Sequence, residues 1–316
     1  MSTAYYLGEE SSVRVPAYAL ITPAHNEAAF IEKTIESVLR QTVLPTKWVV
    51  VDDGSTDKTS EIVKRYLPAN AWMSLIERPT RGDRSFAGKA HAVNAAYETV
   101  KCLKFDVIGN LDADTSFAED HFEFLVSKFL HNPGLGVAGA IFTEDGYSSD
   151  ADSFAGRKHV WGGCQLFRRQ CWEEIGGYFP HRAGGVDWIA VTTARMKGWQ
   201  TETFREKPCV HHRKMGTAGR RPVGAAFSRG ERDYYLGGHP LWEIFRVGYR
   251  CIKRPYLVGG IALGCGYFFS FLRRAPRPVS KELMTFHRKG QMARLGAIVK
   301  SLAKFKRLDG FNLEGV

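Results

Sequence analysis

Several features that mark other protein classes are missing from this chain. Its six cysteines show no Cys-x-x-Cys spacing, which argues against a zinc site or a disulfide framework and fits a reducing compartment. Residues 1–15 are polar and acidic and lack the apolar core of a signal peptide. The chain also lacks internal repeats and low-complexity tracts. We therefore expect a globular protein that resides in the cytoplasm.

Two common nucleotide-binding signatures are also missing. No Gly-x-Gly-x-x-Gly fingerprint follows the first predicted strand, and no Walker-type phosphate loop occurs. The first absence counts against a dinucleotide-binding Rossmann domain, and the second against a P-loop nucleotide hydrolase.

Positive charge is concentrated at one end of the chain. The 316 residues are 44% hydrophobic and carry a formal net charge of +11. Residues 241–316 hold 15 lysine and arginine residues against 4 acidic ones, which leaves 29 of each sign in the first 240 residues. A balanced globular domain is therefore followed by a basic region, which we expect to meet an anionic surface.

Apolar runs and helical periodicity alternate along the first two thirds of the chain. This alternation predicts an α/β fold with an open, mostly parallel sheet and helices on both faces. We predict strands at 18–22, 48–51, 74–76, 105–108, 136–142, 161–169 and 202–210. We predict helices at 30–39, with Asn26 as its N-cap, and at 58–66, 90–100, 119–130, 171–175 and 189–197, and a mobile polar loop at 143–156.

Polar clusters follow three of these predicted strands, at Pro23–Glu27, Asp52–Asp57 and Asp112–Thr115. Ligands of open parallel sheets bind beyond the carboxyl ends of the strands, so these clusters predict a nucleotide-type site. Asp53 and Asp57 could instead only cap the helix that follows them.

Asp112 and Asp114 are the centre of this predicted site. Side chains two residues apart lie on one side of a strand, so both carboxylates can face one pocket. Two like charges need a compensating cation there, and Mg²⁺ or Mn²⁺ carrying a diphosphate supplies it. A solvated acidic loop is the simpler alternative.

These motifs, in this order, resemble family 2 glycosyltransferases with the Rossmann-like GT-A fold. The resemblance covers roughly residues 18–215 and rests on 23–27 (PAHNE), 50–57 (VVDDGSTD), 88–90 (GKA), 112–114 (DAD), 176–178 (GGY) and 187–188 (DW). It implies an inverting transfer of a sugar from a nucleotide sugar, most often a UDP-sugar, to a hydroxyl group, with Mn²⁺ or Mg²⁺ as cofactor.

The resemblance also assigns roles to residues. Asp112 would approach the ribose or the metal, and Asp114 would bind the metal directly. Asp187 takes the place of the catalytic base; the family often has Glu-Asp there, whereas this chain has Val186-Asp187, so the assignment rests on Asp187 alone. The residues implied to hold the base and ribose are Pro23, Asn26, Glu27 and Asp53.

Basic residues near these motifs have two interpretations each. Lys89, with Arg81 and Arg84, could contact the diphosphate or be ordinary surface charge. One of His211 and His212 could complete the metal shell, since imidazole suits Mn²⁺, or both could belong to a solvated basic turn. A lid over the leaving diphosphate could be formed by Arg213, Arg220 and Arg221.

The basic end contains 17 residues without a charge, Tyr256–Leu272, between clusters of arginine and lysine. A spanning helix needs about 20 apolar residues, with ~17 as the short limit. Together with an amphipathic stretch before it and a basic helix at 283–302, it predicts a monotopic attachment to the anionic cytoplasmic face of a membrane. The alternatives are a spanning helix or a buried helix in a homo-oligomer interface.

This interpretation divides the chain into an N-terminal extension (1–17), a glycosyltransferase domain (18–220) and a helical membrane-associated region (221–316). Membrane attachment suits a polyprenyl-linked or other glycan acceptor in exopolysaccharide or surface-glycan synthesis. The rival functions are a metal-dependent nucleotidyltransferase and a non-catalytic protein that binds a membrane or nucleic acid through its basic end. Nucleic acid is disfavoured, because the charges flank an apolar block instead of aromatic stacking platforms.

Overall fold

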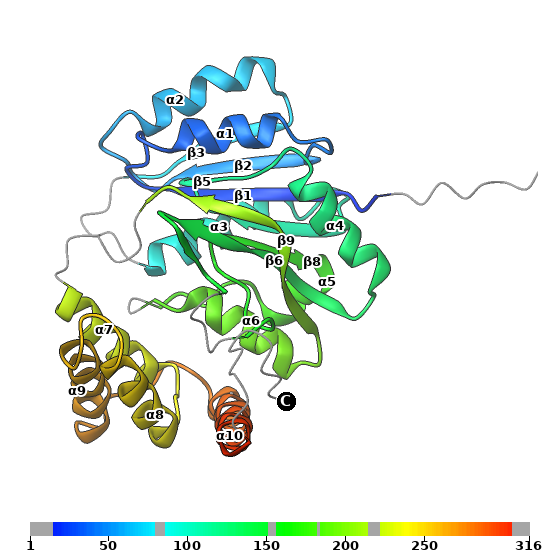
Figure 1. The fold of residues 1–316 in the computed structure, drawn as a ribbon. Helices are drawn as coiled ribbons and strands as arrows, with labels where there is room; N and C mark the ends of the chain where they lie inside the picture. The colour runs from blue at the N-terminus through cyan, green and yellow to red at the C-terminus, as the bar shows by residue number, and fades with distance from the viewer. Residues whose placement is uncertain (1–14, 80–85, 151–155, 182–183, 214–221, 305–316) are drawn as a thin grey trace, which may run out of the picture.

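The computed structural model describes residues 15–79, 86–150, 156–181, 184–213 and 222–304. A nine-stranded sheet with helices on both faces is followed by a group of C-terminal helices (Figure 1). The strands are β1 (Tyr18–Ala24), β2 (Lys47–Asp52), β3 (Met73–Glu77), β4 (Val107–Leu111), β5 (Thr115–Ser116), β6 (Leu135–Glu144), β7 (Tyr147–Ser148), β8 (Cys164–Arg168) and β9 (Gln200–His211).

The helices on the sheet are α1 (Ile31–Leu39), α2 (Thr59–Tyr66), α3 (Phe86–Val100), α4 (His121–His131), α5 (Arg169–Ile175) and α6 (Val186–Met196), with a 3₁₀ turn at Leu67–Ala69. The C-terminal helices are α7 (Pro222–Tyr235), α8 (Pro240–Cys251), α9 (Val258–Leu272) and α10 (Lys281–Ala303).

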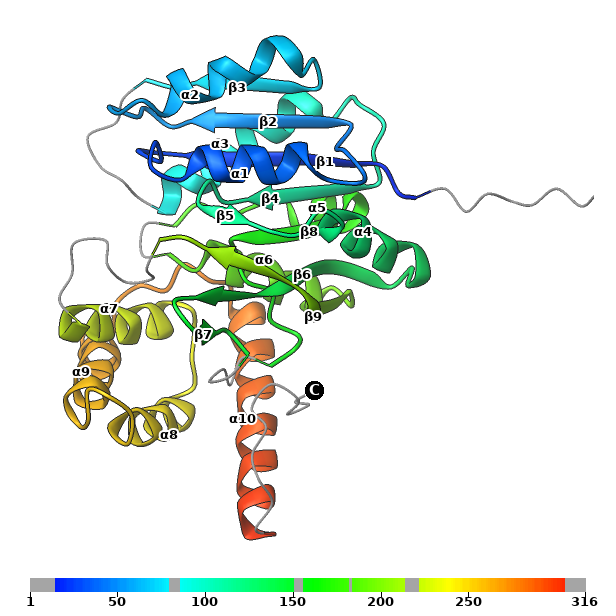
Figure 2. The same ribbon diagram turned by 45° about the horizontal axis from the view of Figure 1, so that its top comes forward.

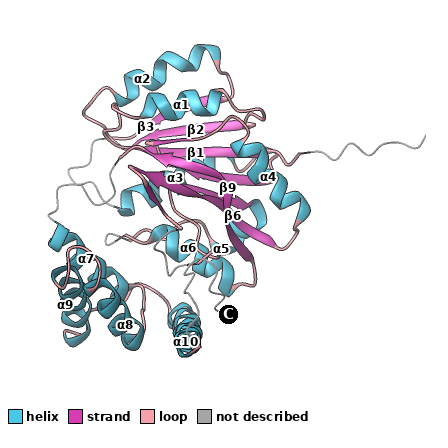
Figure 3. Cartoon of the chain, viewed as in Figure 1, coloured by secondary structure: helices cyan, strands magenta, loops and turns pink. Residues whose placement is uncertain are grey.

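Most strands of the sheet point the same way (Figure 3). The strand order is β3-β2-β1-β4-β8-β6-β9-β5, and β7 pairs with β6. The pairs β1–β2, β1–β4, β2–β3 and β6–β9 are parallel. Because β8 runs antiparallel to both β4 and β6, β6 and β9 share the direction of the first four strands. The predicted mostly parallel α/β sheet is confirmed.

The alternation of side chains along β1 and β2 builds a core on each face of the sheet. Leu20 and Val50 pack in the core under α1, α2 and α4, whereas Ile21 and Val51 pack in the core under α3, α5 and α6. Two-sided burial explains why these strands read as continuous apolar runs in the sequence.

Three local predictions were wrong. Asn26 does not cap α1, which begins only at Ile31; Asn26 has a φ of 56° and its side chain accepts a hydrogen bond from the Thr56 amide at 2.8 Å. The strand predicted from residue 161 begins at Cys164. The stretch after residue 142 is no simple loop, because β6 continues to Glu144 and pairs with β7.

Glycines determine how the C-terminal helices pack. A Cβ atom at Gly230 would lie 2.0 Å from the Leu263 carbonyl oxygen, and one at Gly266 would lie 2.0 Å from the Phe227 carbonyl oxygen. Helices α7 and α9 therefore touch backbone to backbone, which only glycine permits. Helix α10 extends away as one long rod and packs through Leu283 against Ile189 of α6 (Figure 2).

Within the described parts of the chain, every helix is too short or too polar to cross a membrane. The uncharged segment forms α9, which has 15 residues. The predicted domain boundary at residue 220 and the first 14 residues fall outside the described ranges.

Candidate active site

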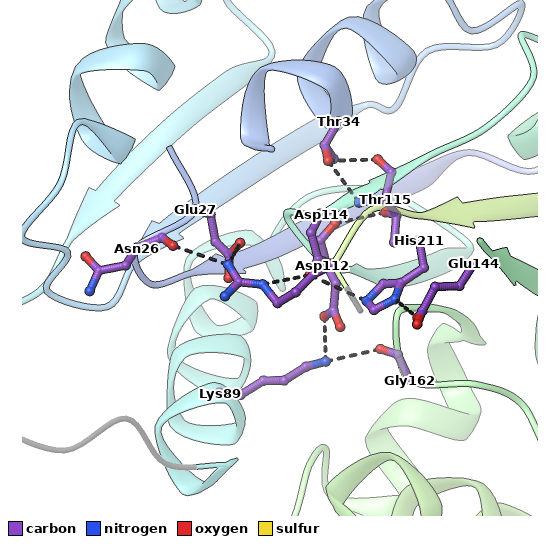
Figure 4. Close-up of polar contacts among 11 residues, drawn as sticks. Asn26, Glu27, Thr34, Lys89, Asp112, Asp114, Thr115, Glu144, Gly162 and His211 are labelled. Carbon is purple, nitrogen blue, oxygen red and sulfur yellow. Dashed lines mark hydrogen bonds and ion pairs between the residues drawn. The ribbon is translucent and has the colours of Figure 1, made fainter. Parts of the chain in front are cut away.

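The three predicted polar clusters meet at the carboxyl ends of the strands. Residues of the first and third clusters, Asn26, Glu27, Asp112 and Asp114, lie close together in Figure 4. Strand β1 lies between β2 and β4, and Ala24 at its end pairs with Asp52 at the end of β2. Because all three strands are parallel, their carboxyl ends open toward the same side.

Asp112 and Asp114 lie on a turn and not on the strand itself. Strand β4 ends at Leu111, after which the Asp112 amide donates to the Gly163 carbonyl at 2.8 Å and the Thr115 hydroxyl donates to the Asp112 carbonyl at 2.9 Å. The predicted strand-like alternation of the two carboxylates is therefore wrong, yet the turn brings both into the site.

Each carboxylate has its own cationic partner. The Lys89 ammonium, on α3, lies 2.5 Å from Asp112 Oδ1 and donates to the Gly162 carbonyl at 3.1 Å. Burial raises the pKa of Asp112, and the negative charge of Asp114 adds to this, whereas Lys89 opposes it. A second cation near this carboxylate would therefore be stabilised by the site.

His211, the last residue of β9, joins Asp114 to a third carboxylate. Its Nε2 atom lies 3.5 Å from Asp114 Oδ2, and its Nδ1 atom lies 2.8 Å from Glu144 Oε2. Burial alone would lower the pKa of His211, but its contacts with Asp114 and Glu144 raise it to about 8. The pKa of Asp114 is lowered, since the His211 contact and the Arg213 charge outweigh its burial.

His212 is directed elsewhere. Its Nε2 atom lies 2.8 Å from the Ser116 hydroxyl, and its ring stacks on Phe30 with the centroids 6.4 Å apart. Neighbouring residues at a strand end point to opposite sides, so only one of the two histidines can face Asp114. The structure brings His211, and not His212, to the acidic pair.

Arg213 connects the acidic pair to the loop after β1. It forms an ion pair with Glu27, lies 3.5 Å from Asp114 Oδ2 through Nε, and donates to the Asn26 carbonyl at 3.3 Å. The other candidate diphosphate ligands, Arg81, Arg84, Arg220 and Arg221, fall outside the described residues.

The loops after β1 and β2 are hydrogen-bonded into one unit. Asp57 accepts from the Ala28 amide and from the Thr59 amide, both at 3.0 Å, so it caps α2 and holds the first loop as well. The Asp53 carboxylate lies 3.0 Å from Arg78 Nη1 and stays 16% exposed. Pro23 precedes the last residue of β1. Arg78 was not foreseen in the sequence, because it follows a weakly patterned strand.

Asp187 lies close to this group, in the first turn of α6. A Cβ atom at Gly162 would lie 2.7 Å from Asp187 Oδ2, so the carboxylate packs directly on this glycine. The carbonyl of the same glycine accepts from Lys89 and, at 2.8 Å, from Asn110. Gly162 thus lies between Asp187 and the Lys89–Asp112 pair in space. The next residue, Trp188, packs on His287 of α10 with the ring centroids 4.4 Å apart.

The donor atoms fit a hard or borderline divalent cation. Two carboxylates and one imidazole are ligands that Mn²⁺ accepts, and Mg²⁺ accepts the carboxylates. Glu144 accepts from His211 Nδ1 in the neutral tautomer, which leaves Nε2 free to coordinate. Sequence reasoning missed Glu144 because it lay in a stretch interpreted as a loop.

The family follows from comparison with known proteins. Residues 19–172 match the model of glycosyl transferase family 2. This match assigns residues 19–172 to the family. It is 33% identical over 128 residues to the hyaluronan synthase of Pasteurella multocida, which is 40% of this chain and 12% of the synthase. It is 28% identical over 136 residues to the poly-beta-1,6-N-acetyl-D-glucosamine synthase of Staphylococcus aureus, which is 42% of this chain and 31% of that enzyme.

Two solved structures have the same fold as this chain. A mannosyltransferase of Pyrobaculum calidifontis, in complex with GDP-Man and Mn²⁺, superposes with a TM-score of 0.55 at 21% identity, over 93% of this chain and 82% of that one. Residues 1–349 of S. aureus TarS, in complex with UDP-GlcNAc, give a TM-score of 0.52 at 13% identity, over 93% and 89% of the two chains.

Proposed function

We propose that the protein is an inverting, metal-dependent glycosyltransferase that moves a sugar from a UDP-sugar to a hydroxyl group of a glycan or lipid-linked acceptor in polysaccharide or surface-glycan synthesis. The observation that carries the proposal is that Asp112, Asp114 and His211 lie together at the carboxyl ends of the strands. Asp187 lies nearby, on the other side of Gly162. Family membership supports the reaction class over a nucleotidyltransferase. The polysaccharide synthases among its relatives and the UDP-GlcNAc complex support the product and donor classes.

The acidic group would hold the metal. Asp112, Asp114 and His211 supply two carboxylates and an imidazole, a set that favours Mn²⁺ over Mg²⁺. When bound, such an ion neutralises the charge that develops on a diphosphate leaving group.

The surrounding residues would bind and orient the donor. Lys89 and Arg213 lie on either side of the acidic pair and can exchange their carboxylate partners for diphosphate oxygens. The residues of the loops after β1 and β2 would contact the base and ribose: Pro23 is partly buried, Asn26 is exposed, Glu27 is 5% exposed and the Asp53 side chain is 16% exposed.

Asp187 would take the proton of the acceptor hydroxyl as that oxygen attacks the sugar. A base must act on the face of the sugar opposite the leaving group, and a single displacement then inverts the anomeric centre. Asp187 packs on Gly162, whose carbonyl accepts from Lys89, and this nearness to the Asp112–Lys89 pair supports the assignment.

Donor binding is tested by calorimetry with UDP, GDP and dTDP, with and without Mn²⁺. We expect UDP to bind in the presence of Mn²⁺ and Asp114→Asn to abolish this binding. Asp120→Asn is the matched control, because this aspartate pairs with Lys207 outside the site. Failure of folded wild-type protein to bind any of the three nucleotides would refute the proposed function.

The role of Asp187 needs a separate readout. Asp187→Asn should leave Mn²⁺-dependent UDP binding within about twofold of wild type and reduce sugar transfer by ~10²–10⁴-fold, the usual size of a general-base contribution. Equal losses of binding and transfer would instead make Asp187 a donor ligand.

Membrane attachment through α8 and α9 is also part of the proposal. The two helices and the segment that connects them expose many large apolar side chains: Leu241, Ile244, Ile252, Tyr256, Leu257, Val258, Ile261 and Leu272, each at least half exposed. Basic residues at 250, 253, 254, 273 and 274 adjoin this surface and suit anionic headgroups.

Co-sedimentation with vesicles tests this attachment. We expect the full chain to bind vesicles that contain phosphatidylglycerol and the double variant Ile244→Asp, Ile261→Asp to lose most of this binding. Leu44→Asp, which changes an equally apolar residue exposed on the catalytic domain, should bind like wild type. Equal binding of the double variant would exclude α8 and α9 as the attachment surface.

A further inference from the structure

A second group of metal-ligating side chains lies in the core beneath the candidate active site. His121 begins α4, Cys164 begins β8, and Cys209 lies near the end of β9. All three side chains are fully buried. Their neighbours are apolar: the rings of Phe117 and Phe122 lie 4.9 and 5.3 Å from the His121 ring, centroid to centroid.

The spacing of the three ligand atoms matches a single coordinated ion. His121 Nε2 lies 3.7 Å from Cys164 Sγ and 3.6 Å from Cys209 Sγ, and all three atoms fall within 4.8 Å of one another. Zinc bonds of about 2.3 Å to sulfur and about 2.0 Å to nitrogen, at a tetrahedral angle, place N and S about 3.5 Å apart. The side chains already stand at the separation that zinc imposes on its ligands.

Ordinary packing gives these groups little stabilisation. Thiols are weak donors and acceptors, so the sulfur contacts replace the hydration of the imidazole poorly. A metal ion at Nε2 would replace two weak contacts by coordinate bonds.

Charge balance also favours zinc in this position. Two thiolates and a neutral imidazole exactly offset the double positive charge of Zn²⁺, so the occupied site is neutral and its burial carries no net-charge penalty. Thiolate sulfur is a soft ligand that suits zinc, whereas Mn²⁺ and Mg²⁺ prefer oxygen. The two metal sites of the chain therefore differ in the ions they select.

We propose that His121, Cys164 and Cys209 form a structural zinc site that is separate from the Asp112–Asp114 site. The protein would supply three of the four tetrahedral ligands. Cys164 and Cys209 follow His121 by 43 and 88 residues in the sequence, so the ion would join three distant segments.

The position of this site gives it a role in the architecture of the active site. Cys164 pairs with Leu111, the residue before Asp112, and Cys209 lies two residues before His211. Zinc would fix β8 and β9 relative to α4 directly behind the residues that we propose hold the catalytic metal.

The test uses the full chain purified under reducing conditions without chelator. We expect one zinc ion per chain by elemental analysis, and a thiolate-to-metal charge-transfer band after replacement by Co²⁺. Cys164→Ser and Cys209→Ser should lose both signals. Cys171→Ser changes another fully buried free thiol and should keep them, as should Asp114→Asn, which acts only on the donor site.

Folded, reduced wild-type protein that contains no zinc and gives no cobalt charge-transfer band would overturn the proposal. Retention of zinc by both serine variants would do so as well, and so would binding of copper(I) without zinc. Because the cobalt spectrum needs only the wild-type chain, the outcome stays decisive even if the serine variants fail to fold. Donor binding is measured independently, so failure of this site leaves the proposed glycosyltransferase activity untouched.

Discussion

Glu243 on α8 is a buried carboxyl group that should destabilise the protein as the pH rises. It is 1% exposed, and its Oε1 atom has no hydrogen-bond partner within the described residues. Burial raises its pKa from 4.5 to about 8, although Arg246 lies 3.4 Å from Oε2. Arg246 is shared with Asp233, whose charge also opposes ionisation of Glu243.

The sign and size of the effect follow from the two pKa values. Between pH 4.5 and 8 the unfolded chain releases the Glu243 proton while the folded chain keeps it, so stability falls with rising pH. One pH unit is worth about 1.4 kcal/mol, and pH 7 lies 2.5 units above the ordinary pKa, so the loss reaches about 3 kcal/mol at neutral pH.

The variant Glu243→Gln removes this titration and keeps the shape of the side chain. Denaturant unfolding at pH 5 and pH 7 should show that the stability of the variant relative to wild type increases by about 2–3 kcal/mol between the two values. Glu282→Gln, at an exposed position of α10, should show a constant difference. If the stabilities of wild type and Glu243→Gln changed in parallel with pH, the claim that Glu243 is buried and uncharged in the folded protein would be refuted.

Three further changes test other parts of the structure. Glu144→Gln should weaken Mn²⁺-dependent UDP binding by ~10–100-fold in calorimetry, because His211 loses the charged partner that orients it. Trp172→Ala should cost about 3–5 kcal/mol in denaturant unfolding, since this 2% exposed side chain packs on three aromatic rings of the core under α3. Gly266→Ala should lower the thermal unfolding temperature, whereas Gly248→Ala, where a Cβ meets nothing within 4 Å, should not; equal effects would contradict the close α7–α9 contact.

The strand ends of the site could be predicted because the signals are local. An apolar run that stops at a polar cluster marks the carboxyl end of a buried strand, and three such ends belong to neighbouring parallel strands. The sequence could not decide between His211 and His212, since the decision depends on which side chain of β9 faces Asp114. It also missed Glu144, which reaches His211 only because β6 and β9 lie side by side.

Contacts between segments that are distant in the sequence explain the other features that the sequence did not predict. The sequence does not reveal that Gly266 of α9 contacts the backbone of α7, because that contact depends on how the two helices pack. The absence of Cys-x-x-Cys spacing argued against a zinc site. His121, Cys164 and Cys209, however, come together from three separate elements. Such groups become visible only when the fold is known.

The internal ion pairs of the candidate active site have a consequence for the order of ligand binding. Asp112 already pairs with Lys89, and Asp114 already pairs with Arg213, so a divalent ion would compete with these two cations for the carboxylates. A diphosphate that attracts Lys89 and Arg213 would release the carboxylates at the same moment. Metal and nucleotide should therefore bind with positive cooperativity, each raising the affinity for the other by the same factor.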